Sequence, residues 1–66
     1  MHVYINNEKV ELSDGSTLAE VLSLRGLDAP GTAVAVDNRV VLRTDRAAYR
    51  LTDGARIVVI KAACGG

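Results

Sequence analysis

The sequence predicts an α+β fold in which a mixed sheet of four to five strands curls around one helix. Segments of alternating apolar and polar residues, typical of half-buried strands, lie on both sides of one segment with helical spacing. The chain of 66 residues is long enough for one domain, and its single cysteine cannot close an internal disulfide. The core must therefore be aliphatic, built from nine Val, seven Leu and three Ile.

The first predicted element is a β-hairpin. Val3 and Ile5 alternate with more polar neighbours, and Val10 and Leu12 repeat this period of two further along the chain. The polar residues 6–9 lie between the two runs and predict the turn.

A short helix follows the hairpin. Thr17 and Glu20 have the spacing of a capping box, although Ser16 is an alternative cap. Gly26 is placed to end the helix in a left-handed conformation, with Leu27 folding back onto it. Helical spacing gives one apolar stripe, formed by Leu18, Val21 and Leu22. Two to three turns are marginal alone, so the stripe should lie against the sheet.

The second half of the chain predicts three more strands. Residues 32–36 form a strand with Val34 and Val36 on one face, residues 37–39 a turn, and residues 40–42 a short strand. We further expect a helical turn at 44–49 capped by Thr44 or Asp45, a turn at Asp53-Gly54, and a last strand at 56–62. This order fits a β-grasp domain at 1–62 with a C-terminal tail at 63–66.

The last strand is apolar without alternation. We expect Ile57 and Val59 to face the helix, which leaves Val58 and Ile60 on the opposite face. No second helix is predicted to cover that face, and a persistent apolar patch on a small domain usually marks a partner surface. We therefore predict that Val58, Ile60 and the neighbouring Lys61 dock partners. The alternative is partial cover by loops or by the stems of Arg and Lys.

The chain ends in Gly65-Gly66, which carries no side chain and forms a thin thread ending in a carboxylate. Fully extended, residues 62–66 reach about 15 Å from the sheet, enough to enter a narrow active site of another protein. Cys64 precedes the two glycines; it is either a small tail residue or a thiol that exchanges with sulfur intermediates.

Charge and composition exclude several classes of function. Residues 1–33 hold five acids against two bases and residues 34–66 hold six bases against three acids, so a basic region near the tail could steer docking. The balanced net charge and the lack of a nucleic-acid motif argue against nucleic-acid binding. One His and one Cys make no metal site, and we expect His2 to be an ordinary edge-strand residue. With no apolar run long enough to span a membrane and no secretory signal, we expect a cytoplasmic protein.

These features together resemble a known family. The order of elements, residues 34–38 (Val-Ala-Val-Asp-Asn), the Asp53-Gly54 turn, the apolar last strand and Gly65-Gly66 are similar to the ThiS family. ThiS proteins are small sulfur carriers of thiamin thiazole biosynthesis with a ubiquitin-like β-grasp fold. The resemblance covers essentially the whole chain.

The resemblance also implies a chemistry. A ThiF-like adenylating enzyme would use MgATP to convert the Gly66 carboxylate to an acyl-adenylate. A persulfide from a cysteine desulfurase or rhodanese-type donor would then give a Gly66 thiocarboxylate, which a ThiG-like thiazole synthase consumes. The chain itself would bind no cofactor and would be a co-substrate of these enzymes, not an enzyme.

Three other functions are compatible with parts of this sequence pattern. A MoaD-like carrier, or a carrier for cysteine, tRNA or natural-product sulfur chemistry, would keep the tail and change the recipient. A ubiquitin-like modifier would conjugate Gly66 to lysines of target proteins. A β-grasp binding module would tolerate deletion of Gly65-Gly66.

Overall fold

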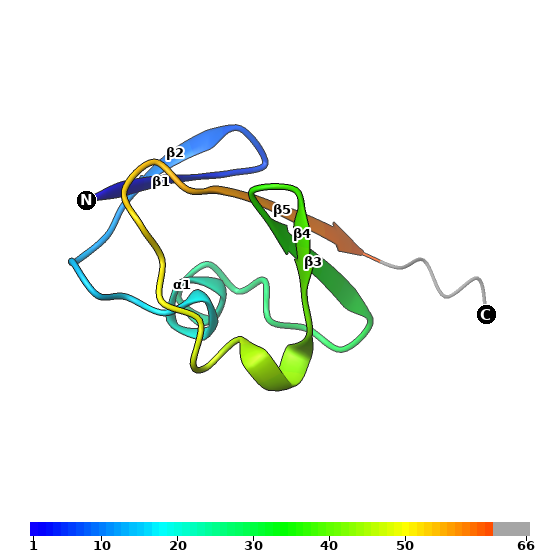
Figure 1. The fold of residues 1–66 in the computed structure, drawn as a ribbon. Helices are drawn as coiled ribbons and strands as arrows, with labels where there is room; N and C mark the ends of the chain where they lie inside the picture. Colours follow the sequence, from blue (N-terminus) through cyan, green and yellow to red (C-terminus); the bar gives the residue numbers. More distant parts are fainter. Residues whose placement is uncertain (62–66) are drawn as a thin grey trace.

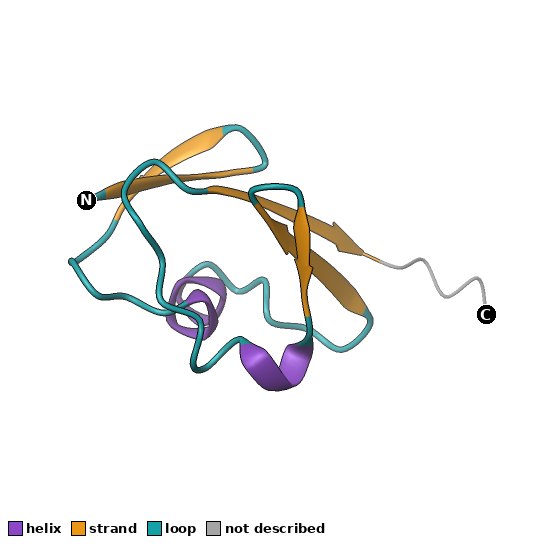
Figure 2. Ribbon diagram, viewed as in Figure 1, coloured by secondary structure: helices purple, strands orange, loops and turns teal. Residues whose placement is uncertain are grey.

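The computed structural model describes residues 1–61 of the chain. Its elements are, in order, β1 (His2–Ile5), β2 (Glu8–Glu11), α1 (Leu18–Leu24), β3 (Thr32–Val36), β4 (Arg39–Val41), the 3₁₀ helix η1 (Arg43–Asp45) and β5 (Arg56–Lys61). The five strands form one sheet in the order β2-β1-β5-β3-β4, in which β1 and β5 are parallel and the other neighbours antiparallel. Both helices lie on the same side of this sheet (Figures 1 and 2). The predicted mixed β-grasp sheet is confirmed.

Two-residue turns close both hairpins. Asn6 and Asn7 connect β1 to β2 with φ of 49° and 70°, and Asp37 and Asn38 connect β3 to β4 with φ of 50° and 68°. Positive φ at both central positions matches the twist of the paired strands, and Asn and Asp tolerate it better than most residues. The turns are shorter than the predicted ranges 6–9 and 37–39 because pairing continues up to the turn residues.

The N-terminus of α1 is a capping box. The Thr17 hydroxyl accepts a hydrogen bond from the Glu20 amide at 3.2 Å, and the Glu20 carboxylate accepts one from the Thr17 amide at 2.8 Å. Thr17 is therefore the cap, and Ser16 is not. The hydroxyl of Ser16 instead donates to the carbonyl of Ser13 at 2.7 Å, which tightens the preceding turn.

The C-terminus of α1 and the core follow the sequence pattern as well. Gly26 has φ of 67°, and the Leu27 amide donates to the Leu22 carbonyl at 2.8 Å, the bond expected when the chain folds back after a left-handed residue. The apolar stripe of the helix is fully buried, in one cluster with side chains from the sheet. The core consists of Val3, Ile5, Leu18, Val21, Leu22, Val34, Val36, Val41, Leu51, Ala55 and Ile57.

The segment after β4 differs from the prediction. Its helical turn begins at Arg43 rather than Thr44, ends at Asp45, and follows Leu42 without a side-chain cap. Arg46, one residue after this turn, is only 3% exposed, and its guanidinium donates to Asp28 at 3.2 Å and to the carbonyl of Thr32, the first residue of β3, at 3.1 Å. The buried Arg46 side chain thus connects the segment after β4 to Asp28 and to the start of β3.

Candidate functional site

The face of the sheet opposite α1 carries the exposed part of β5. Ile57 is buried and Val59 partly buried on the helix side, whereas Val58 is 44% and Ile60 60% exposed. The predicted division of the strand between two faces is confirmed. An Ile and a Val therefore remain in solvent on a strand that leads directly toward residues 62–66.

Neighbouring strands enlarge this apolar surface. Strand register places Ala35 beside Val58 and Ala33 beside Ile60, and it places Val40 of β4 beside Ala35. Val40 is itself strongly exposed. We call these residues (Ala33, Ala35, Val40, Val58 and Ile60) the open apolar patch. Sequence reasoning missed Val40, although the buried Val41 next to it was a usable signal, because neighbours in a strand face opposite sides.

The remaining predicted site residues are placed differently. Lys61 is exposed, but the alternation of β5 assigns it to the face of Ile57 and Val59, so it does not belong to the open apolar patch. The spacing of residues 57, 59 and 61 in the sequence already indicated this shared face. Gly66, Gly65 and Cys64 lie outside the described residues.

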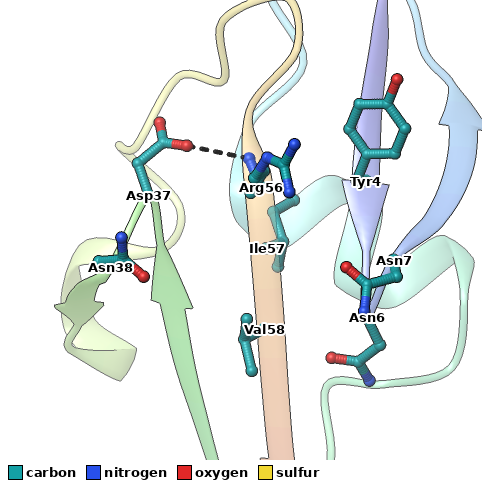
Figure 3. A pocket seen from close by; sticks show the side chains of 8 residues that line it. All are labelled: Tyr4, Asn6, Asn7, Asp37, Asn38, Arg56, Ile57 and Val58. Carbon is teal, nitrogen blue, oxygen red and sulfur yellow. Dashed lines mark hydrogen bonds between the residues drawn. The ribbon is translucent and has the colours of Figure 1, made fainter.

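A pocket that sequence reasoning did not find adjoins the open apolar patch. It has a volume of about 430 Å³ and lies between the two hairpin turns, with the start of β5 as its floor (Figure 3). Its lining consists of Tyr4, Asn6, Asn7, Asp37, Asn38, Arg56, Ile57 and Val58. We call it the inter-turn pocket. The repeated Asn-Asn and Asp-Asn turns were its signal in the sequence, but only the strand order brings them to neighbouring positions.

Two turn side chains bind the backbone of β5. The side-chain oxygen of Asn6 accepts from the Val59 amide at 2.9 Å, while its side-chain nitrogen donates to the Val59 carbonyl at 3.4 Å. The Asp37 carboxylate accepts from the Arg56 amide at 3.0 Å. Both walls of the inter-turn pocket are therefore attached to its floor.

The predicted basic region is partly used inside the domain. Arg43 and the buried Arg46 both bind Asp28, at 3.1 and 3.2 Å. The side chain of Arg56 makes no ion pair or hydrogen bond with any of residues 1–61, and its guanidinium lies 5.7 Å from the centre of the Tyr4 ring. Arg56 is thus a cation on the open side of the sheet that remains available to a partner.

His2 is not an edge-strand residue as predicted, because β1 lies between β2 and β5. Its amide donates to the Asp53 carboxylate at 3.0 Å, and this hydrogen bond is the main cause that lowers the pKa of Asp53 below its usual 3.8. Among residues 1–61 no group of three His, Cys, Asp or Glu side chains is arranged to hold a metal ion. No helix within that range is long and apolar enough to cross a membrane.

Comparisons with known proteins agree with this architecture. A search of curated proteins finds no match. Among solved structures, the chain is similar to the crystal structure of a thiamine biosynthesis protein (ThiS) from Geobacter metallireducens, with a TM-score of 0.84, 22% identity and 100% of both chains covered. At this identity the likeness establishes the fold. A family model matches residues 3–66, so the protein belongs to the ThiS family of small sulfur carriers.

Proposed function

We propose that this protein carries sulfur for the thiazole ring of thiamin as a thiocarboxylate on Gly66. The observation that carries this proposal is the family match, which extends over the β-grasp domain and through Gly65-Gly66. The open apolar patch supports it, because a carrier that is modified by other proteins needs a surface on which they dock.

Activation is required because a terminal carboxylate, with an ordinary pKa of about 3.5, is ionised and a poor acyl donor at neutral pH. A ThiF-like enzyme transfers AMP from MgATP to the Gly66 carboxylate and releases pyrophosphate. The terminal sulfur of a protein persulfide then attacks the acyl carbon, and AMP leaves. A second thiol reduces the resulting acyl disulfide, which yields the Gly66 thiocarboxylate and a new disulfide.

The division of labour follows from the side chains available. The domain supplies a docking surface, and the tail supplies the reacting carbonyl. Gly65 and Gly66 suit a narrow enzyme channel because any side chain there would add width. Partner enzymes provide MgATP, the persulfide of a cysteine desulfurase or rhodanese-type protein, and the acceptor site of a ThiG-like thiazole synthase.

Intact-mass spectrometry tests the proposal. The purified protein is incubated with the ThiF-like enzyme of the same organism, MgATP, a cysteine desulfurase, cysteine and a thiol reductant. We expect a mass increase equal to the difference between sulfur and oxygen, confined to the C-terminal peptide. A variant lacking Gly65 and Gly66 is the control. No mass change in the full chain would refute the proposal, and a covalent link to protein lysines would favour a modifier instead.

A further inference from the structure

The inter-turn pocket shares Val58 with the open apolar patch, so a protein that covers the patch also reaches the pocket. We propose that this pocket receives the carboxylate of an acidic side chain on the adenylating enzyme, bound by the guanidinium of Arg56. The inference rests on the proposed function and adds to it the chemistry of the partner surface: an apolar contact for the patch next to an Asp or Glu.

The guanidinium of Arg56 has no counter-ion among residues 1–61. Arg56 is the first residue of β5 and is exposed, and no carboxylate among residues 1–61 lies within ion-pair distance of its guanidinium. The guanidinium lies 5.7 Å from the centre of the Tyr4 ring. Contact with an aromatic ring orients the guanidinium and leaves its N–H groups available, the arrangement suited to a bidentate carboxylate.

The charges that line the inter-turn pocket favour an anion with a single negative charge. Asp37 is the other charged group in the lining, and it already accepts a hydrogen bond from the Arg56 amide through one oxygen. Its negative charge disfavours a doubly charged phosphate in the same pocket. A carboxylate carried on a peptide brings one negative charge, and the peptide also brings backbone N–H groups for the other Asp37 oxygen. The amides of Asn7 and Asn38 offer further partners to a peptide.

Hydrogen bonds within the domain hold the inter-turn pocket in shape. Asn6 is attached to Val59 by two hydrogen bonds, and Asp37 is attached to Arg56, so both turns are held to β5. A preformed pocket loses less conformational entropy when a partner side chain enters. The pocket therefore offers a fixed site beside a flatter apolar surface.

The test measures ATP–pyrophosphate exchange by the ThiF-like enzyme of the same organism as a function of carrier concentration. The variants are Arg56→Glu, Arg56→Gln and, as matched control, Arg39→Glu. Arg39 is also exposed, is the first residue of β4 and borders the same turn, but it does not line the pocket. Urea unfolding verifies that each variant is folded.

We expect Arg56→Glu to raise the KM for the carrier by about tenfold or more. Arg56→Gln should raise KM less, and Arg39→Glu should leave it within about twofold of the unsubstituted protein. The effect should shrink as salt is added, because ions screen the charge pair. Equal KM values for Arg56→Glu and Arg39→Glu would overturn the inference alone. No exchange with the unsubstituted carrier would instead remove the proposed function, and this inference with it.

Discussion

The side chain of Asn6 binds both backbone groups of Val59, accepting from its amide at 2.9 Å and donating to its carbonyl at 3.4 Å. β1 ends at Ile5, whereas β5 continues to Lys61. The side-chain amide of Asn6 thus takes the place of one more residue of β1 and satisfies backbone groups of β5 beyond the end of β1. It fixes β5 shortly before the chain reaches residues 62–66.

Replacing Asn6 should therefore cost more stability than replacing its neighbour. Asn6→Ala and Asn7→Ala both put alanine at a positive φ, but only Asn6 makes side-chain hydrogen bonds to β5. We expect Asn6→Ala to lower the free energy of unfolding by about 1 kcal/mol more than Asn7→Ala. Urea unfolding measures the difference, and hydrogen exchange should show a faster Val59 amide only in Asn6→Ala. Equal losses would contradict the role of Asn6.

Asp28 should be needed to neutralise a buried charge. It accepts hydrogen bonds from Arg43 and Arg46, and the Arg46 Nε is already buried without a partner among residues 1–61. We expect Asp28→Ala to lower the free energy of unfolding by about 2–3 kcal/mol, because it leaves the Arg46 guanidinium buried and unpaired.

The controls for this prediction separate burial from charge pairing. Arg43→Ala removes an exposed partner and should cost less than about 1 kcal/mol. Adding Arg46→Met to Asp28→Ala should recover part of the loss, since no buried charge is then left uncompensated. Chemical denaturation of the four proteins gives these values, and an Asp28→Ala protein as stable as Arg43→Ala would contradict the argument.

The capping box should make stability depend on pH. Hydrogen bonds from the Thr17 amide and then the Thr17 hydroxyl lower the pKa of Glu20 below its usual 4.5. Because the folded pKa lies below the unfolded value, the stabilisation is complete above about pH 4.5 and is lost as the pH falls through the folded value. Glu20→Gln should therefore be less stable than the unsubstituted protein at about pH 6, and the difference should narrow toward about pH 3. Urea unfolding midpoints of the two proteins across this pH range test the prediction. A difference between the midpoints that stays constant with pH would contradict it.

The open apolar patch should matter for docking and not for folding. Ile60→Ser removes an apolar contact that a partner would bury, and we expect it to raise the KM for the carrier in pyrophosphate exchange by about tenfold. Leu24→Ser is the matched control, since Leu24 is 79% exposed but lies on α1, away from the patch. Both changes should alter the free energy of unfolding by less than about 0.5 kcal/mol. A similar rise in KM for Leu24→Ser would show that exposed apolar residues act without regard to position.

The terminal glycines should be required for their lack of side chains. Gly65→Val should slow pyrophosphate exchange by more than about tenfold, because the added side chain widens the segment next to the reacting carboxylate. Ala62→Val, which also adds bulk but lies further from Gly66, should retain most of the exchange. Neither change should affect unfolding of the domain. Normal exchange with Gly65→Val would rule out entry of the tail into a narrow channel.

Local chemistry explains why much of the fold was predictable from the chain. The Thr17–Glu20 capping box, the left-handed Gly26 and the two polar turns act between residues close in sequence, so their geometry is specified by the residues themselves. Strand geometry likewise places Val58 and Ile60 together on one face, because a strand turns successive side chains to opposite sides, and burial of Ile57 shows that theirs is the open face.

Features that depend on distant residues were not predictable in this way. The burial of Arg46 depends on the loop that carries Asp28, and the inner position of β1 depends on its pairing with β5. The sequence alone thus determined most of the elements, the division of the last strand between two faces and, through its pattern, the family. Only the tertiary structure decided which strands are neighbours, and with that the inter-turn pocket, since the two turns are separated by about half the chain and are brought together by β5.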